Sequence, residues 1–115
     1  MRHIEDILQM HSVRWFDYKY PQYSKLLHHS PNGGFRNTKE AARFKANGTR
    51  AGFPDLILLV ARHGYNCLCI EMKSPTGKQT TLQREWQLEA EKQGNKYVII
   101  RDVESFIKTI NEYLK

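Results

Sequence analysis

The sequence predicts a three-layer α/β domain with a central mixed sheet flanked by helices. Two short apolar runs, 55–61 and 67–73, flank turn-forming residues at 63–66, which is the pattern of a β-hairpin. A third apolar run, 97–100, lies between two segments whose apolar residues have helical spacing. Elements in this order pack as layers around one sheet. The length of 115 residues predicts a single domain, 1–115.

The first part of the chain is expected to be helical. Apolar residues at helical spacing predict a first helix over about residues 3–18, ended by Pro21. The stretch from His28 to Gly34 contains Pro-Asn-Gly-Gly and is expected to form a loop. A short second helix should follow, with Thr38 as its N-cap and Asn47-Gly48 at its end.

The second part of the chain supplies the predicted sheet. The run 55–61 is apolar on both alternating faces, so it is expected to be a central strand covered on two sides. After the hairpin, Thr80 or Thr81 should cap a third helix that ends at Gly94. A last amphipathic helix is expected to carry Val103, Phe106, Ile107, Ile110 and Leu114.

The composition favours a basic protein in a reducing compartment. The net charge of +6 favours a polyanionic partner. No apolar run approaches the roughly 18 residues of a membrane span, and the first residues lack the apolar core of a signal peptide. Cys67 and Cys69 are too close together for a disulfide framework, and their spacing is unusual for zinc, so core cysteines are expected. We therefore expect a cytoplasmic protein with no membrane partner.

Charged residues stand at the ends of two otherwise apolar strands. Asp55 opens the first run, and Glu71 and Lys73 close the second. A hairpin centred near His63-Gly64 would place Asp55 and Glu71 almost opposite each other, with Cβ atoms about 5 Å apart if directly paired. Two carboxylates that close repel each other unless a cation lies between them, and such hard oxygen ligands suit Mg²⁺ or Mn²⁺. A salt bridge at the strand ends is the alternative explanation.

These residues resemble a known nuclease motif. Pro54-Asp55 followed by Glu71-Met72-Lys73 looks like the core of the PD-(D/E)xK nucleases. Over about residues 5–101, the order of motifs closely resembles the VRR-NUC family of virus-type replication and repair nucleases. The other matching positions are Glu5, Gln9, His29 to Gly34, Ala42 to Lys45, Gly48, Gly52 to Leu56, Gln83 and Trp86. The resemblance implies a restriction-endonuclease-like fold over nearly the whole chain. It also implies that the cell is a bacterium or a phage-infected host.

The resemblance implies a set of metal ligands. Glu5, Asp55 and Glu71 would supply carboxylates, and the backbone carbonyl group of Met72 would be a further ligand. Asp6 is an alternative to its neighbour Glu5, which is also explained as a first-turn carboxylate favoured by the helix dipole.

Two further residues are implied to act on the attacking water. Lys73 would orient or deprotonate it, and Gln83, early in its helix, would support the water or the site; a surface amide is the alternative for Gln83. Three carboxylates against one lysine would repel a phosphodiester. One or two divalent ions, Mg²⁺ or Mn²⁺, reverse that charge and activate water. Metal dependence therefore follows from charge as well as from the resemblance.

A basic segment precedes Asp55 in the sequence. From Arg36 to Arg50, five basic residues stand against one acid, Glu40. Such a run is often only a solvated face, but its position next to Asp55 favours contact with phosphates. The residues expected to contact DNA are His29, Asn32, Arg36, Lys39, Arg43, Lys45, Arg50 and Lys78.

The sequence therefore predicts a divalent-metal-dependent, structure-specific DNA endonuclease that acts on branched DNA such as four-way junctions. A basic nucleic-acid-binding module that does not cut, or an exonuclease or flap nuclease, are the alternatives. The resemblance also implies a homodimer, because stand-alone members of this family resemble small homodimeric resolvases.

Overall fold

A four-stranded mixed sheet forms the centre of the computed structural model, which describes residues 2–30 and 37–115. The strands lie in the order β1-β2-β3-β4. Strand β2 is antiparallel to both β1 and β3, and β4 runs parallel to β3. The strands are β1 Leu27–His29, β2 Leu56–Leu58, β3 Leu68–Met72 and β4 Lys96–Ile100. The helices are α1 Arg2–Lys19, the 3₁₀ helix η1 Pro21–Leu26, α2 Thr38–Ala46, α3 Thr81–Lys92 and α4 Val103–Tyr113. The predicted α/β class is confirmed.

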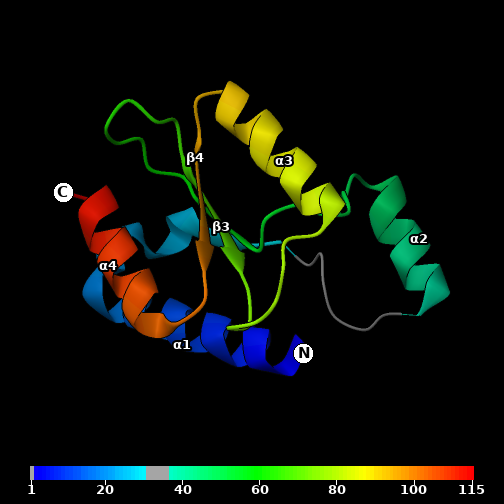
Figure 1. Ribbon diagram of the computed structural model, residues 1–115, viewed down its shortest axis with the longest axis horizontal. Helices are drawn as coiled ribbons and strands as arrows, with labels where there is room; N and C mark the ends of the chain where they lie inside the picture. Colours follow the sequence, from blue (N-terminus) through cyan, green and yellow to red (C-terminus); the bar gives the residue numbers. More distant parts are fainter. Residues whose placement is uncertain (1, 31–36) are drawn as a thin grey trace.

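Helices cover both faces of the sheet. Figure 1 shows α1 and α4 packed together on one side of β3 and β4, with α3 on the other side. The parallel pairing of β3 with β4 needs a crossover, and α3 provides it. Successive residues of β3 point to opposite faces, so this strand divides its side chains between the two helical layers.

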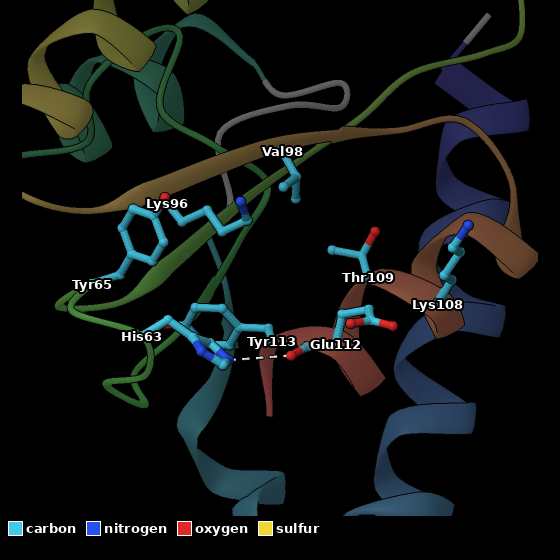
Figure 2. A pocket seen from close by; sticks show the side chains of 8 residues that line it. All are labelled: His63, Tyr65, Lys96, Val98, Lys108, Thr109, Glu112 and Tyr113. Carbon is cyan, nitrogen blue, oxygen red and sulfur yellow. Dashed lines mark hydrogen bonds between the residues drawn. The ribbon is translucent and has the colours of Figure 1, made fainter. Parts of the chain in front are cut away.

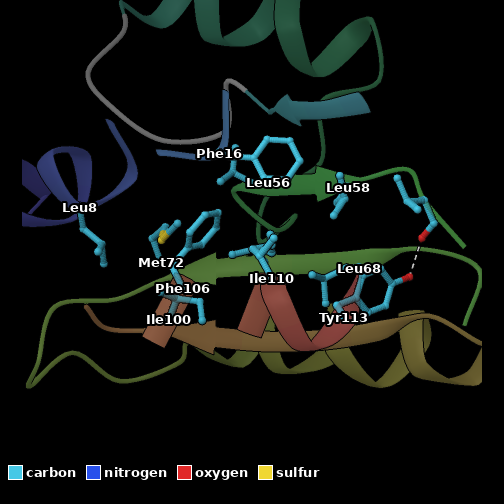
Figure 3. Close-up of a cluster of buried hydrophobic side chains, with 12 residues drawn as sticks. Leu8, Phe16, Leu56, Leu58, Leu68, Met72, Ile100, Phe106, Ile110 and Tyr113 are labelled. Carbon is cyan, nitrogen blue, oxygen red and sulfur yellow. Dashed lines mark hydrogen bonds between the residues drawn. The ribbon is translucent and has the colours of Figure 1, made fainter. Parts of the chain in front are cut away.

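The hydrophobic core lies between the sheet and the α1/α4 layer. Figure 3 shows leucines of β2 and β3 facing Phe106 and Ile110 of α4, which lie four residues apart on one helical face. Phe16 of α1 fills the same layer, and all three side chains are fully buried. Tyr113 closes one end by donating a hydrogen bond from its hydroxyl group to the Val60 carbonyl oxygen, at 2.6 Å. Truncation of a core side chain such as Phe106 to alanine should cost about 3–5 kcal/mol of unfolding free energy.

The predicted hairpin between β2 and β3 is confirmed. Its turn is formed by His63 and Gly64, both with positive φ (54° and 85°), and Arg62 and Tyr65 exchange backbone hydrogen bonds across it. Two consecutive residues of positive φ are typical of a type I′ turn, whose twist matches that of antiparallel strands.

The strand expected over 55–61 is shorter than predicted. β2 spans only Leu56–Leu58, although the Leu59 backbone N–H still donates to the Leu26 carbonyl oxygen at 2.9 Å. The expectation that both faces are covered was wrong at Leu59, whose side chain is 60% exposed. The physical reason is the reach of α3, which covers the outer face near Ile57, where Phe53 and Trp86 lie, but not further along β2.

Two other local expectations were wrong. His28 and His29 belong to β1, an edge strand, rather than to a loop; only Leu27 in this strand is apolar, so its pattern gave little strand signal. The N-cap of α2 is Asn37, whose side chain accepts a hydrogen bond from the Glu40 backbone N–H at 2.7 Å. Thr38 is already the first helical residue.

Helix α2 stands apart from the layers. Figure 1 shows it beyond α3 and away from the sheet, and none of its residues is fully buried. It ends at Asn47, followed by Gly48 with φ of +107°, as the sequence predicted. No helix in the part of the chain that the structure describes is long and apolar enough to cross a bilayer.

Candidate active site

Asp55 directly precedes β2 and lies opposite Glu71 of β3 when the strand register is extended. The observed pairs include Leu56 with Ile70, and extending this register by one residue pairs Asp55 with Glu71. One carboxylate oxygen of Asp55, Oδ2, accepts a hydrogen bond from the Met72 backbone N–H at 2.7 Å. The sequence-based expectation that the hairpin brings these two acids together is confirmed.

The backbone of Asp55 is also tied to the end of β1. Its carbonyl oxygen accepts a hydrogen bond from the Ser30 backbone N–H at 3.0 Å, and it lies 3.1 Å from Nδ1 of His29. The same His29 nitrogen lies 2.9 Å from the side-chain amide of Gln9 in α1. Helix α1 and strand β1 therefore both help to fix the position of Asp55.

Glu71 is fully buried, and its two carboxylate oxygens have different surroundings. Oε1 accepts hydrogen bonds from the Tyr97 hydroxyl group at 2.7 Å and from Nε2 of Gln79 at 3.1 Å. Oε2 accepts no hydrogen bond from any residue that the structure describes. A buried carboxylate oxygen without a donor costs free energy, so this atom is suited to bind a cation.

Lys73 supplies the nearest positive charge. Its Nζ lies 3.7 Å from Oε2 of Glu71, and its side chain is only 8% exposed. Its backbone N–H donates to the Ile100 carbonyl oxygen at 2.9 Å, which continues the pairing of β3 with β4 beyond Met72. As predicted from their spacing, Glu71 and Lys73 point to the same side of the strand.

Tyr97 keeps its proton in this environment. Burial, followed by the hydrogen bond to Glu71, raises the pKa of Tyr97 well above its usual value. The hydroxyl group therefore acts as a hydrogen-bond donor to the carboxylate of Glu71 at neutral pH.

The oxygen atoms at the strand ends fit a hard divalent cation. Oε2 of Glu71, the carboxylate of Asp55 and the Met72 carbonyl group are the donor type that Mg²⁺ and Mn²⁺ prefer. Within residues 2–30 and 37–115, no three His, Cys, Asp or Glu side chains form a group able to hold a metal ion. The structure thus brings Asp55 and Glu71 together and does not add Glu5 as a third side chain. Glu5 lies one turn before Gln9 on α1, and its role stays a prediction.

Gln83 has a structural role at the start of α3. Its Oε1 accepts from the Thr80 backbone N–H at 2.9 Å, and its own backbone N–H donates to the Thr80 hydroxyl oxygen at 3.1 Å. This capping box identifies Thr80 as the N-cap. The amide that contacts Glu71 is instead Gln79, and a catalytic role of Gln83 stays a prediction.

Sequence reasoning missed Gln79 and Tyr97. Gln79 lies in an irregular segment with no periodic signal, and Tyr97 was counted only as a strand residue. One signal was present in principle: in β4, Tyr97 pairs with Cys69, so it lies on the same sheet face as Glu71. That register requires the parallel pairing of β3 and β4, which the sequence alone did not give.

Helix α3 packs against the segment that precedes Asp55. The indole N–H of Trp86 donates to the Ala51 carbonyl oxygen at 3.1 Å, and the Trp86 and Phe53 rings meet edge to face at 4.8 Å. Because Gln79 lies just before the same helix, α3 and its leading residues position both sides of the candidate site.

The segment after Lys73 is held by Arg101. Its guanidinium group donates from Nη1 to the carbonyl oxygens of Ser74 at 2.8 Å and Gly77 at 2.7 Å. The backbone that follows Lys73 is thereby fixed against the end of β4.

The residues predicted to contact DNA lie mostly on the surface. Asn32 and Arg36 fall outside the described residues. His29 is exposed, but its ring contacts Gln9 and the Asp55 backbone. The other candidates are all exposed: Lys39, Arg43, Lys45, Arg50 and Lys78.

Two of these exposed residues, Lys39 and Arg43, line a small cavity at α2. It has a volume of about 300 Å³ and is lined by Asn37, Lys39, Glu40 and Arg43. The Arg43 guanidinium group also lies over the Phe44 ring at 5.9 Å. Arg43 and Phe44 do not belong to the group of side chains around Glu71.

The two cysteines are structural. Cys69 is buried, and burial together with the neighbouring Cys67 raises the pKa of the Cys69 thiol to about 12. Cys67 donates from its Sγ to the Asn95 side-chain oxygen at 3.2 Å. These neutral thiols line a cavity of about 300 Å³ between the sheet and α3.

A third cavity lies on the opposite face of the sheet from the cysteines. Figure 2 shows His63 and Tyr113 at its floor, Tyr65 and Lys96 on one wall and α4 on the other. Its volume is about 420 Å³. Lys96 and Val98 point to the α4 side of β4, whereas Tyr97 between them points to Glu71, so the sheet separates this cavity from the candidate site.

The fold and this site together define a class of protein. An aspartate and a buried glutamate lie at adjacent strand ends with a lysine two residues further on, which is the arrangement expected from the PD-(D/E)xK motif. The VRR-NUC domain family matches residues 2–103, so the chain belongs to the VRR-NUC family, and a nuclease-type function follows.

A solved structure supports the same assignment. The chain is 31% identical in sequence to a protein described as a VRR_NUC domain protein, with a TM-score of 0.82. The match covers 96% of this chain and 88% of that one. A search of curated proteins found no match. The family predicted from the motif order is therefore confirmed.

Proposed function

We propose that this protein is a divalent-metal-dependent endonuclease that hydrolyses phosphodiester bonds in branched DNA such as four-way junctions. The observation that carries the proposal is the environment of the buried Glu71 carboxylate. Its buried Oε2 accepts no hydrogen bond from the described residues, and it faces Lys73 at 3.7 Å. Asp55 stands opposite it across the strand ends.

The oxygen ligands for the metal would come from Asp55, Glu71 and the Met72 carbonyl group, with Glu5 as a further candidate. Asp55 is held by the Met72 N–H and by the end of β1. Glu71 is held by Tyr97 and Gln79. Mg²⁺ or Mn²⁺ would supply an activated water and offset the negative charge of the phosphate. Hydrogen bonds within the protein therefore hold both proposed ligand side chains.

Lys73 would act on the attacking water. Its ammonium group has three N–H donors, and Glu71 lies on one side of it. The remaining donors can orient the water or contact a phosphate oxygen. Because the side chain is almost fully buried, these contacts form away from bulk water, where they are stronger.

The basic residues of α2 support DNA as the partner. Lys39, Arg43 and Lys45 are exposed on a helix that stands away from the core, where a nucleic-acid backbone can reach them. Contacts to phosphates fix position but carry no sequence information. Recognition is therefore expected to depend on DNA shape more than on base sequence.

A homodimer would explain a preference for branched DNA. A small domain offers little surface for gripping two duplex arms, whereas two sites related by a two-fold axis could engage a four-way junction symmetrically. The family resemblance to small homodimeric resolvases supports this arrangement.

The test is cleavage of a panel of DNA substrates with Mg²⁺. Four-way junctions, flaps, linear duplexes and single strands would be compared, with junctions of the same shape but scrambled sequence. We expect junctions to be cut fastest, with little sequence dependence, and no cutting by Glu71→Gln. Tight binding without cutting would favour a binding module, and trimming from ends only would favour an exonuclease. Equal cutting of duplex and junction at one fixed sequence would defeat the structure-specific proposal.

A further inference from the structure

The two oxygens of Glu71 are not equivalent, and the difference is built by residues outside the nuclease motif. Oε1 has two donors, the Tyr97 hydroxyl group at 2.7 Å and Gln79 Nε2 at 3.1 Å. Oε2 has none among the described residues and lies on the Lys73 side. A carboxylate whose one oxygen is doubly hydrogen-bonded is fixed in rotation about its last bond, and presents the other oxygen.

The orientation of the Gln79 amide is itself determined. Its Nε2 group also donates to Oε1 of Gln87 at 2.9 Å, so both of its N–H bonds point at acceptors. Gln87 in turn donates from its Nε2 to Oε2 of Glu91 at 3.1 Å. A carboxylate at Glu91 can only accept, which fixes the direction of the Gln87 amide and then that of Gln79. The donations therefore run outward from Gln79, to Glu71 on one side and through Gln87 to Glu91 on the other, so Gln79 presents an N–H and not its carbonyl oxygen to Glu71.

Tyr97 approaches from the sheet and Gln79 from the segment before α3. Tyr97 is only 7% exposed, and its position is fixed by the pairing of β4 with β3. The two donors therefore belong to different elements, and each holds Oε1 from its own side.

We infer that Tyr97 and Gln79 are positioning residues that hold Glu71 as a one-oxygen ligand and thereby favour Mg²⁺ or Mn²⁺ over Ca²⁺. This inference rests on the proposed metal-dependent function. Mg²⁺ needs near-ideal octahedral geometry and short bonds, which single carboxylate oxygens satisfy, whereas Ca²⁺ accepts two oxygens of one carboxylate and looser geometry. Engaging Oε1 removes the two-oxygen mode from Glu71.

The experiment compares metal binding in Tyr97→Phe, Gln79→Met and the double variant. Mg²⁺, Mn²⁺ and Ca²⁺ affinities would be measured by calorimetry without DNA, and kcat and KM would be measured on a cleaved substrate. Tyr113→Phe is the matched control, because it removes another buried tyrosine hydroxyl group whose hydrogen bond, 2.6 Å long, goes to Val60 and not to Glu71.

We expect each of the two variants to lose about tenfold in Mg²⁺ affinity, as is usual when a residue that orients a metal ligand is removed. The Ca²⁺ affinity should be unchanged or higher, so the Mg²⁺-to-Ca²⁺ preference falls, and falls further in the double variant. The value of kcat should decrease while KM for DNA does not change. Tyr113→Phe should lose thermal stability with no change in metal preference.

The possible failures are distinguishable. If Tyr97→Phe and Gln79→Met keep the wild-type metal preference, as Tyr113→Phe does, the two residues are merely structural and the inference is wrong. If the wild-type protein itself binds no divalent ion and cuts no DNA, the proposed function fails first.

Discussion

Gly52 lies so close to Leu82 that a Cβ atom at position 52 would be 2.8 Å from the Leu82 Cβ and 2.9 Å from its backbone carbonyl carbon. Leu82 is in the first turn of α3, and Gly52 is three residues before Asp55. The close approach lets the chain pass against α3 on its way into β2. The glycine is needed both for this contact and for its φ of +84°.

Gly52→Ala should therefore disturb the candidate site as well as the fold. The left-handed backbone costs about 1 kcal/mol for alanine, and the contact with Leu82 should add about 1–3 kcal/mol. Gly64→Ala is the matched control, since Gly64 has a φ of +85° but open space around its Cβ position. Urea unfolding would measure both variants, and only Gly52→Ala should also weaken metal binding. Equal losses in the two variants would show that the α3 contact is unimportant.

Asp55→Asn should abolish cleavage while keeping the fold. The asparagine side-chain oxygen can still accept the Met72 hydrogen bond, so the backbone at the strand end should not move. The lost negative charge weakens binding of a divalent ion. Calorimetric Mg²⁺ titration and circular dichroism would separate these two effects. An excess of chelator should stop the wild-type protein, and cutting that persists in chelator would exclude the metal mechanism.

Lys73→Ala should separate rate from affinity. Because Lys73 is proposed to act on the water and the transition state, kcat should fall strongly while DNA and metal binding persist. Without metal, the buried charge of Glu71 loses its nearest cation, which should cost about 3 kcal/mol of unfolding free energy. Added Mg²⁺ should restore part of that stability. An equal fall in DNA affinity and in rate would instead make Lys73 a simple phosphate contact.

Arg43→Ala should weaken DNA binding in a salt-dependent way. Each lost phosphate contact should reduce the slope of log affinity against log salt by about 0.9 on duplex arms. The control is Lys108→Ala, which removes an exposed cation that lines the cavity on the α4 side of the sheet. Binding measured at several salt concentrations should show a smaller slope only for Arg43→Ala. The same change in both variants would mean that net charge, rather than α2, governs binding.

The sequence predicted the hairpin well because several signals agreed. Two apolar runs, a turn at His63-Gly64 and charges at the strand ends all required the same register, and Asp55 does lie opposite Glu71. The edge strand β1 could not be predicted in this way, since Leu27 is its only apolar residue. Its pairing with β2 supplies the hydrogen bonds that its own composition does not suggest.

The two residues that donate hydrogen bonds to Glu71 could not be predicted from one sequence. Gln83 was predicted from its motif, but the amide that contacts Glu71 belongs to Gln79, four residues earlier. The two glutamines differ in tertiary position, because Gln83 caps α3 while Gln79 precedes the cap and faces the sheet. Tyr97 likewise depends on a parallel strand pairing between residues far apart in the chain. The local sequence pattern indicates neither the tertiary position of a glutamine nor the pairing of distant strands.

Residues 51–53, which lie between α2 and the candidate site in the sequence, are attached to α3. Ala51 and Phe53 are fastened to Trp86, between α2 on one side and Asp55 on the other. If α2 contacts DNA as proposed, we expect a displacement of this helix to be taken up at this attachment before it reaches Asp55 and Glu71. We therefore expect that the length and charge of α2 can change, by design or during evolution, without altering the arrangement of Asp55 and Glu71 at the strand ends.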